Sequence, residues 1–556
     1  DPAAVDLLSR ESGLSPLASL LLVHRGHGDP ASASRFLSPS FSDLHDPFLM
    51  HGMAAAVERL AAAARRGEQV CVYGDYDVDG ITSTALLVDF FRAVGIRCFY
   101  RIPLRMEEGY GLSEHGIRSA VAGGAAVIVT VDCGVSAVQE AELCRSLGVD
   151  LIITDHHTPG PVLPRACAVI NPHIPACSFP FKLLAGVGVA FNLAIALRTR
   201  LREEGLLPDG GPNLRRYLDL VALGTIADIV PLVDENRIFV TFGLQELSAG
   251  TRVGVGALKG AAGVLREVTC GAVGFRLAPR INACGRLEDA SAAVELLLTS
   301  DPKRAAELAG DLEAGNAERQ ALEQAILRDA LLQVGSDPRI ACRKSIVLSS
   351  DEWHPGVIGI VASRIVDMYH RPTVLIAFRD GSGKGSGRSI PAFHLHDALC
   401  ACADHLVKFG GHKYAAGLSI DQETLEAFIC SFDEIASGLL SEEDLIPEVA
   451  VDAEVFGPQV TADLVRTASR LEPFGPGNPE PVFLLRNARV QERRLLKDQH
   501  LKLAVSVPPG RFDAIGFNMA ERRFGDTVDI LFSPQFNEWN GKKRLQLRLR
   551  DIRDCS

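Results

Sequence analysis

The most informative segment of this sequence reads Val72-Tyr73-Gly74-Asp75-Tyr76-Asp77-Val78-Asp79-Gly80. The apolar run 69–73 predicts a short buried strand, and the apolar residues from 81 to about 93 predict a helix. A strand, an acidic loop and a helix in this order are typical of open α/β sheets, which bind ligands at the carboxyl ends of their strands. The segment therefore predicts a functional site at a sheet edge.

Three aspartates, Asp75, Asp77 and Asp79, occupy alternate positions in this segment. Carboxylates this close repel one another unless a cation lies between them. Their hard oxygen atoms suit magnesium or manganese. The alternative is an ordinary turn, since Asp and Gly both favour turns. The rest of the sequence decides between these interpretations.

Further acidic and imidazole side chains follow the ends of other predicted elements. Asp132 follows the apolar strand 127–131, Asp155-His156-His157 follows the strand 151–154, and Asp228 ends the helical run 221–227. Because the carboxyl ends of parallel strands share one edge, these groups should converge on the three aspartates. Such a set can hold two divalent ions about 4 Å apart for attack on phosphorus. A lone aspartate here is more often a helix N-cap, and a lone histidine pair is usually structural, so the prediction depends on the combination.

The length of 556 residues is too great for one hydrophobic core. Strands that alternate with helices between about 68 and 170 predict a parallel sheet covered on both faces. No apolar run reaches the roughly 18 residues that span a bilayer, so we expect no membrane association. The 13 cysteines contain no CxxC pair, which favours free thiols in a reducing cytoplasm.

Composition shifts divide the chain into five segments. We expect a leader (1–45) packed on the first domain, an α/β domain (46–290), a long connecting helix (291–338), a second α/β domain (339–442) and a C-terminal β-barrel (443–556). The Gly-rich stretch 381–387 is expected to form a loop.

The charge is unevenly distributed along the chain. The net charge is −12, yet residues 486–556 contain 15 Lys plus Arg against 9 Asp plus Glu. An acidic protein with a basic C-terminal module can still bind a polyanion through a local patch and metal ions.

Several short motifs together resemble the DHH phosphoesterase superfamily. They are Gly74–Gly80, Val131-Asp132-Cys133-Gly134, Thr154-Asp155-His156-His157 and Gly224-Thr225-Ile226-Ala227-Asp228. Gly385-Ser386-Gly387-Arg388 and Gly410-Gly411-His412 are similar to the DHH-associated domain. The stretches Arg105–Leu112, Arg280–Arg286 and Glu472–Pro479 resemble the RecJ family of single-strand-specific exonucleases. The resemblance covers roughly residues 45–550.

The resemblance implies a multidomain α/β fold: a parallel-sheet DHH domain and an α/β DHH-associated domain joined by a long helix, then a β-barrel OB-fold. It also implies roles for the clustered side chains. Asp155 would orient the histidines, His157 would face the scissile phosphate, and Asp75 would lie on or beside a metal ion. The implied metal ligands are Asp77, Asp79, Asp132, His156 and Asp228. Tyr73 stands where the pyrophosphatase branch has a histidine, which argues against a pyrophosphatase and leaves one metal site a ligand poorer.

The resemblance further implies a set of substrate contacts. Arg105, Ser386 and Arg388 would bind a terminal phosphate, and His412 would contact the nucleotide backbone. A cluster of polar side chains would track the phosphates of a single strand: Arg280, Asn282 and Arg286. The alternatives are surface arginines, a flexible loop, a structural histidine and solvated charges.

These features lead us to expect a cytoplasmic exonuclease that uses two Mn or Mg ions on single-stranded DNA with a 5′ end. It would act 5′ to 3′ and release mononucleotides in DNA repair and recombination, with a helicase and a single-strand-binding protein as candidate partners. One alternative is a DHH-type nanoRNase or cyclic-dinucleotide phosphodiesterase, although such chains generally stop after the associated domain. The other is a non-catalytic DNA-binding scaffold, like a eukaryotic replication relative that has lost ligands.

The C-terminal barrel would bind single strands through basic and aromatic side chains. The alternative is that the aromatic rings fill the barrel core. The candidates are Arg493, Arg494, Lys497, Lys542, Lys543 and Arg544, with Phe517, Phe536 and Trp539 as stacking platforms.

Overall fold

The computed structural model describes residues 2–104, 108–207, 211–287, 290–539 and 542–555. The chain groups into two compact units. The first contains residues 1–278, 290–306 and 450–556, and the second contains residues 279–289 and 307–449. Within the described residues, no helix combines the length and the apolar character needed to cross a bilayer.

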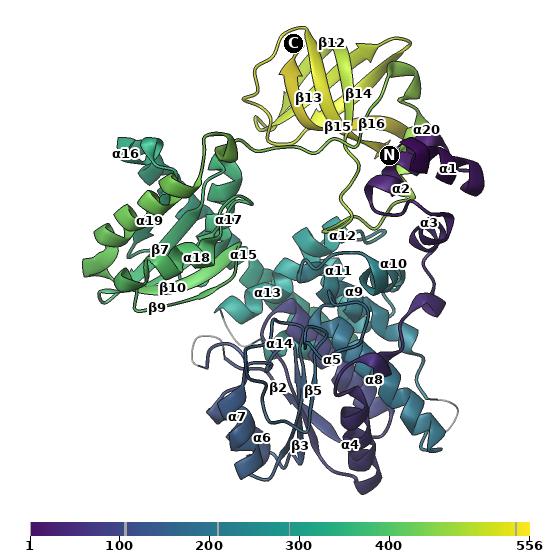
Figure 1. Cartoon of the computed structure of the whole chain (residues 1–556), viewed down its shortest axis with the longest axis vertical. Helices are drawn as coiled ribbons and strands as arrows, with labels where there is room; N and C mark the ends of the chain where they lie inside the picture. The colour runs from purple at the N-terminus through teal and green to yellow at the C-terminus, as the bar shows by residue number, and fades with distance from the viewer. Residues whose placement is uncertain (1, 105–107, 208–210, 288–289, 540–541, 556) are drawn as a thin grey trace. The chain divides into compact units, whose positions relative to one another are not determined.

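A five-stranded parallel sheet forms the centre of the first α/β domain (Figure 1). Its strand order is β2-β1-β3-β4-β5. The strands are β1 (Val70–Tyr73), β2 (Cys98–Arg101), β3 (Val127–Val131), β4 (Asp150–Thr154) and β5 (Ala168–Ile170). All residues of β1, β3 and β5 are buried, which explains why these strands are continuous apolar runs in the sequence.

Helices cover both faces of this sheet (Figure 1). On one face lie α4 (Met53–Arg66), α5 (Val78–Ala93) and α8 (Gly186–Glu203), and on the other lie α6 (Glu114–Ala122) and α7 (Val138–Ser146). The chain continues in α9 (Leu218–Ala227), α10 (Asp234–Ala249), α11 (Val253–Ala261), α12 (Cys270–Ala272), η5 (Val273–Leu277), α13 (Ala278–Leu287) and α14 (Ser291–Leu298). The predicted parallel α/β domain is confirmed.

The start of α5 differs from the prediction. The apolar pattern placed it at Ile81, whereas the helix begins at Val78 because Asp77 is its N-cap. The Asp77 Oδ1 accepts a hydrogen bond of 3.0 Å from the Gly80 N–H. Asp79 therefore lies in the first helical turn, where the helix dipole favours a negative charge.

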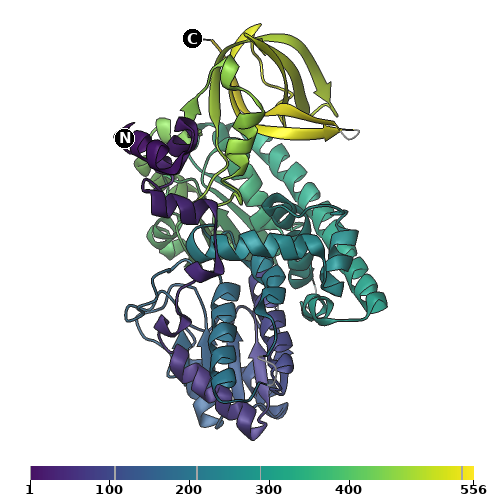
Figure 2. The same cartoon turned by 90° about the vertical axis from the view of Figure 1, so that its right-hand side faces the viewer.

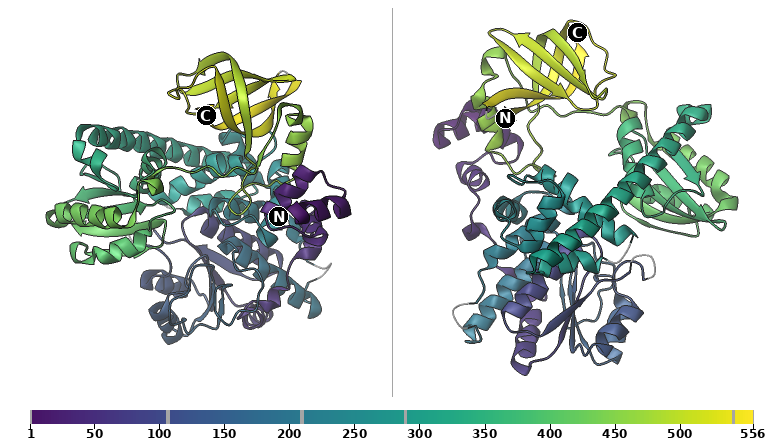
Figure 3. Two further views of the ribbon diagram at one scale, coloured as in Figure 1. Left: turned by 45° about the horizontal axis from the view of Figure 1, so that its top comes forward. Right: turned by 180° about the vertical axis from the view of Figure 1, so that it is seen from behind.

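The second unit contains a mixed sheet of order β6-β7-β8-β10-β9. Its strands are β6 (Ile346–Ser350), β7 (Thr373–Arg379), β8 (Ser382–Arg388), β9 (Lys408–Gly411) and β10 (Ala415–Asp421). Its helices are α16 (Pro338–Cys342), α17 (Ile358–Tyr369), α18 (Leu395–Ala401) and α19 (Leu425–Leu439). The predicted long helix is present as α15 (Pro302–Ser336), which is continuous in both views of Figure 3.

The expectation of a Gly-rich loop at 381–387 is wrong, because most of this stretch forms strand β8. The glycines alternate with polar residues, as the period of a strand requires. A Cβ on Gly385 would approach Leu418 Cδ1 to 2.5 Å, and a Cβ on Gly387 would approach Leu395 Cδ2 to 2.9 Å. The glycines thus face the tightly packed core of the domain.

The C-terminal module is a closed barrel (Figure 2). Its strands pair in the order β12-β13-β14-β16-β15, and β15 pairs back onto β12. They are β12 (Phe483–Leu496), β13 (His500–Val507), β14 (Gly510–Gly516), β15 (Thr527–Trp539) and β16 (Lys542–Asp554). The short strand β11 (Ala453–Glu454) pairs in parallel with β12, and the helix α20 (Ala462–Ser469) lies between β11 and β12 in the sequence. The predicted barrel is confirmed.

The leader contains α1 (Pro2–Ser12), α2 (Pro16–His24) and α3 (Pro30–Leu37). We expected it to pack on the first domain, and for these helices that expectation is largely wrong. Leu21, Leu22 and Phe36 belong to the same buried cluster as Phe483 and Phe532 of the barrel. The apolar face of a helix packs against another apolar surface of the protein. The order of segments in the sequence does not show which domain provides that surface.

The segment Glu472–Pro479, which carried part of the family resemblance, joins the leader, α10 and the barrel. Arg237 of α10 donates hydrogen bonds to the carbonyls of Phe36 (2.9 Å), Leu471 (3.1 Å) and Glu472 (2.7 Å). The Arg237 guanidinium also lies 3.7 Å from the centre of the Phe36 ring. These contacts connect three segments that are far apart in the sequence.

Asn478 is fully buried within this junction. Its Nδ2 donates to the carbonyls of Leu471 (2.7 Å) and Pro473 (2.9 Å), and its Oδ1 accepts from Arg25 Nε (2.9 Å). One side chain thus satisfies groups from both the leader and the loop before the barrel.

We expect Asn478→Ala to destabilise the leader and barrel by about 1–3 kcal/mol, because buried polar groups lose their partners. Urea denaturation followed by circular dichroism, with limited proteolysis of the leader, measures the effect. Asn537→Ala, at an exposed position of β15, is the matched control. Equal stability of the two variants would contradict a structural role for the junction.

Candidate active site

The carboxyl ends of the parallel strands gather the polar side chains that the sequence singled out. Asp75 follows β1, Asp132 follows β3, Asp155 follows β4, and Asn171 follows β5. All four side chains are buried. Asp132 also has a positive φ of 60°, a conformation that L-residues rarely adopt and that is often found at functional sites.

Asp79 reaches the same edge from the first turn of α5. Its carboxylate accepts hydrogen bonds from the backbone N–H groups of Gly186 (2.6 Å) and Val187 (2.8 Å) at the start of α8. Gly186 is required because a Cβ there would lie 2.7 Å from Asp132 Cβ. Two helix N-termini therefore meet at the acidic cluster, and both favour negative charge.

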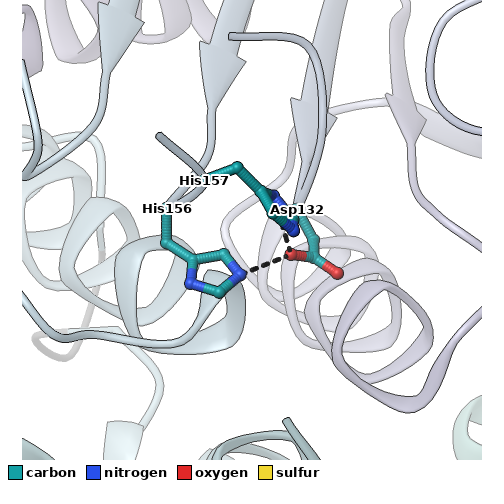
Figure 4. A group of neighbouring side chains, drawn as sticks. All are labelled: Asp132, His156 and His157. Atoms are coloured by element: carbon teal, nitrogen blue, oxygen red, sulfur yellow. Dashed lines mark ion pairs between the residues drawn. The ribbon is translucent and has the colours of Figure 1, made fainter. Parts of the chain in front are cut away.

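The His156 ring points its Nε2 at the Asp132 carboxylate (Figure 4). Its Nε2 is 3.1 Å from Asp132 Oδ1, 3.6 Å from Asp228 Oδ2 and 3.9 Å from Asp79 Oδ2. Asp228 is the C-cap of α9, so a helix end completes the set. Within the described residues, the buried Asp132 Oδ1 and His156 Nε2 have no hydrogen-bond partner.

Buried oxygen and nitrogen atoms that face one another without hydrogen bonds are arranged as the ligands of a metal ion would be. In the part of the chain that the structure describes, three groups of side chains each place one ligand atom per residue within 4.8 Å of the others. Carboxylates with one imidazole suit Mn²⁺ and Mg²⁺ chemistry better than sulfur-rich sites do. The groups are Asp75, Asp77 and Asp132; Asp79, His156 and Asp228; and Asp132, His156 and His157.

The pKa values reflect this crowding. Burial, followed by the neighbouring Asp77, raises the pKa of Asp79 to about 7. Burial and Asp79 raise the pKa of Asp228 to about 9, and the same causes raise the pKa of Asp132 well above its usual range. Burial lowers the pKa of His156 to about 4, which keeps its imidazole neutral and able to bind a cation. A divalent ion would favour the ionised carboxylates.

Asp155 orients the two histidines. Its carboxylate accepts from the backbone N–H of His156 (2.7 Å), from the backbone N–H of Val135 (2.9 Å) and from His157 Nδ1 (2.7 Å). Burial raises the pKa of Asp155, but its hydrogen bond and charge interaction with His157 outweigh burial and lower it. For His157, the same contacts overcome burial and raise the pKa to about 9.

Sequence reasoning missed two side chains at this edge. The Tyr110 hydroxyl donates to the Asp132 carbonyl (3.0 Å) and lies 3.2 Å from His157 Nδ1. Asn171 Nδ2 donates to the His157 carbonyl (2.8 Å). Asn171 directly follows the strand Ala168–Ile170, so the position after a strand end, which predicts Asp132, also indicates Asn171. Tyr110 lies in a loop, and no pattern in the sequence indicates its contact.

Five other predicted residues belong to the second compact unit. Ser386 and Arg388 are two residues apart on β8, and Arg388 Nη1 donates to Ser386 Oγ (3.1 Å). Arg280 lies in α13 and forms an ion pair with Glu313. Asn282 is also in α13, and His412 follows β9. Arg105 and the side chain of Arg286 are outside the described residues.

Three protein-family models match successive parts of the chain. The DHH family N-terminal domain matches residues 69–225, the DHHA1 domain matches residues 343–438, and the RecJ OB domain matches residues 451–551. A parallel sheet that gathers carboxylates and imidazoles at its carboxyl edge, in a chain with these matches, defines a phosphoesterase of the DHH type.

Comparison with individual proteins identifies the family within this superfamily. The chain is 40% identical to the single-stranded-DNA-specific exonuclease RecJ of Bacillus subtilis, over 99% of this chain and 70% of that protein. It is 40% identical to RecJ of Escherichia coli, over 90% of each chain. The crystal structure of Thermus thermophilus RecJ in complex with Mn²⁺ matches with a TM-score of 0.86 and 35% identity, over 100% of this chain and 78% of that one. The chain belongs to the RecJ family.

We expect Asp132→Asn to lower the cleavage rate by more than about tenfold, because loss of a metal ligand costs several kcal/mol of transition-state stabilisation. Asparagine keeps the shape of the side chain and tolerates positive φ. The measurement is hydrolysis of a labelled single strand with added Mn²⁺.

The same variant should raise the melting temperature of the metal-free protein at neutral pH. When folding raises the pKa of a carboxyl, the folded state becomes less stable as the pH rises and the carboxyl must ionise. A neutral amide does not ionise, so it does not cause this loss of stability. Glu203→Gln, exposed on α8, is the control. Retained activity, or a lower melting temperature of the metal-free variant, would contradict the metal-site assignment.

Proposed function

We propose that this chain is a single-stranded-DNA-specific exonuclease that hydrolyses phosphodiester bonds with two divalent metal ions, Mn²⁺ or Mg²⁺. It acts from the 5′ end, releases mononucleotides and serves DNA repair and recombination in the cytoplasm. The observation that carries the proposal is the buried cluster in which Asp132 Oδ1 and His156 Nε2 face each other 3.1 Å apart without hydrogen-bond partners among the described residues.

The residues present fit two ions. Asp77 groups with Asp132, and Asp79 belongs to a second group. Asp132 belongs to two of the three candidate groups and is therefore suited to contact both ions. His156 and Asp228 complete the second site, and Asp75 belongs with the first. When bound, such ions lower the pKa of an attacking water and neutralise charge that develops on the phosphate.

His157 is suited to face the scissile phosphate. Its ring is held through Nδ1 by Asp155 (2.7 Å), and 46% of its side chain is exposed. Its pKa of about 9 makes it cationic at neutral pH. A positioned cation stabilises a phosphate most as negative charge increases in the transition state.

Ser386 and Arg388 are suited to bind the 5′-terminal phosphate. Burial lowers the pKa of Arg388, and no carboxylate among the described residues forms an ion pair with it. A half-buried guanidinium without a counter-charge fits a phosphate monoester, which accepts several charge-assisted hydrogen bonds. Arg105 is expected to share this role.

The barrel supports a long polymeric substrate. Phe517 and Phe536 are 52% and 41% exposed, so the alternative that they fill the barrel core is wrong for these two rings. Arg494, with 73% of its side chain exposed, provides charge on the same module. These features favour an exonuclease on long strands over a nanoRNase or cyclic-dinucleotide phosphodiesterase. The complete acidic set disfavours a non-catalytic scaffold, and a helicase and a single-strand-binding protein remain candidate partners.

We expect Arg388→Ala to slow cleavage of 5′-phosphorylated strands by about tenfold or more relative to 5′-hydroxyl strands, because a charge-assisted contact contributes about 1.5–3 kcal/mol. The measurement is a time course on matched oligonucleotides that differ only in the 5′ group. Lys384→Ala, exposed on the same strand, is the control. An equal effect of Arg388→Ala on both substrates would refute end recognition at this site.

The barrel is better tested by surface substitution than by truncation, because the leader helices share its core. We expect the double variant Phe517→Ala, Phe536→Ala to bind long single strands at least tenfold more weakly, since each stacked base contributes about 1–3 kcal/mol. Cleavage of very short oligonucleotides should continue. Phe48→Ala, at an exposed ring outside the barrel, is the control, and unchanged affinity of the double variant would exclude stacking on these rings.

A further inference from the structure

We propose that Gly359, which no sequence pattern singled out, is a positioning residue for recognition of the 5′ end. It keeps the N-terminus of α17 open for the side chains of Ser386 and Arg388, and its own N–H completes their set of hydrogen-bond donors. The inference rests on the proposed function, and it names a third contributor to the terminal-phosphate pocket.

The geometry of β8 brings the three residues together. Ser386 and Arg388 are two positions apart on one strand, so they point to the same face of the sheet. A Cβ on Gly359 would lie 2.7 Å from Ser386 Oγ, 3.5 Å from Ser386 Cβ and 3.0 Å from Arg388 Nη2. The bare Cα of Gly359 therefore lies directly against both polar side chains.

The conformation of the backbone does not require a glycine at position 359. Gly359 lies in the first turn of α17 and does not have a positive φ. Alanine is favoured over glycine within helices by about 1 kcal/mol. The close neighbours are side-chain atoms and not backbone atoms. An alanine would consequently displace the Ser386 hydroxyl and the Arg388 guanidinium while the helix remained intact.

The N–H of Gly359 is a further hydrogen-bond donor in the first turn of α17. Among the described residues, this N–H has no hydrogen-bond acceptor, as is usual in the first turn of a helix. The N-terminus of a helix of this length attracts anions. The amide, the Ser386 hydroxyl and the Arg388 guanidinium together offer donors for the terminal oxygens of a phosphate monoester. A 5′-hydroxyl end has no such oxygens.

The test compares cleavage of matched 5′-phosphate and 5′-hydroxyl strands by wild type and Gly359→Ala. We expect the alanine variant to lose at least tenfold of the preference for 5′-phosphate, with a much smaller change on 5′-hydroxyl strands and an unchanged or higher melting temperature. Gly315→Ala is the matched control, because a Cβ at that position of α15 has no neighbour within 4 Å. Its preference should equal that of the wild type.

A second comparison shows whether Gly359 acts through Arg388. In an Arg388→Ala background, Gly359→Ala should reduce the remaining preference by much less than tenfold, because the guanidinium that the new methyl group would displace is already gone. If the single Gly359→Ala variant folds poorly, Gly359→Ala with Ser386→Ala removes the closest contact, and this protein should show a lower preference than Ser386→Ala alone.

The outcomes separate this inference from the proposed function. A wild type without any preference for 5′-phosphate would overturn end recognition and the role of Gly359 together. A wild type with a clear preference that Gly359→Ala keeps would overturn only the role of Gly359. Equal slowing of both substrates by Gly359→Ala would also overturn it, because a general structural defect lowers both rates.

Discussion

Electrostatic repulsion between buried carboxylates is the strongest constraint on the site at the carboxyl edge of the parallel sheet. Asp79, Asp132 and Asp228 surround one imidazole at distances below 4 Å, and burial raises the pKa values of all three carboxyls. Isolated buried charges of one sign are too costly to keep in a folded protein unless they bind a cation or take up protons. A cluster of this kind is stable in its ionised form only as a metal site, and the affinity for metal is therefore coupled to the stability of the domain.

The scaffold maintains the cluster by placing rigid elements around it. The parallel sheet fixes Asp132 and Asp155 at strand ends, and the N-terminus of α8 holds the Asp79 carboxylate through two backbone N–H groups. Gly186 permits the close approach, just as Gly359 permits the approach of α17 to β8 in the other unit. In both places, a missing side chain lets a helix N-terminus lie close to polar side chains: the Asp132 carboxylate at Gly186, and the Ser386 hydroxyl and Arg388 guanidinium at Gly359. This arrangement positions ligands accurately because neither backbone must move when they bind.

Much of the fold and of the site could be predicted from the sequence, for physical reasons that also explain the failures. Strands such as Val70–Tyr73 are continuous apolar runs because they are buried on both faces, and Asp132 and Asp155 were found because parallel strands end at one edge. Local capping by Asp77, in contrast, started α5 earlier than its apolar pattern indicated. The glycines of Ser382–Arg388 favour the prediction of a loop, because glycine is common in turns, whereas their alternation with polar residues is the pattern of the observed strand. The packing of the leader on the barrel and the contact of Tyr110 with His157 depend on tertiary structure, which no local pattern contains.

We propose that this cluster binds two divalent ions through Asp132. The most direct measurement is the number of Mn²⁺ ions bound per chain, determined by calorimetric titration of the metal-free protein and by anomalous diffraction from crystals grown with Mn²⁺. We expect two ions per chain in the wild type, both in contact with the Asp132 carboxylate. A single ion, or two ions of which neither contacts Asp132, would contradict it.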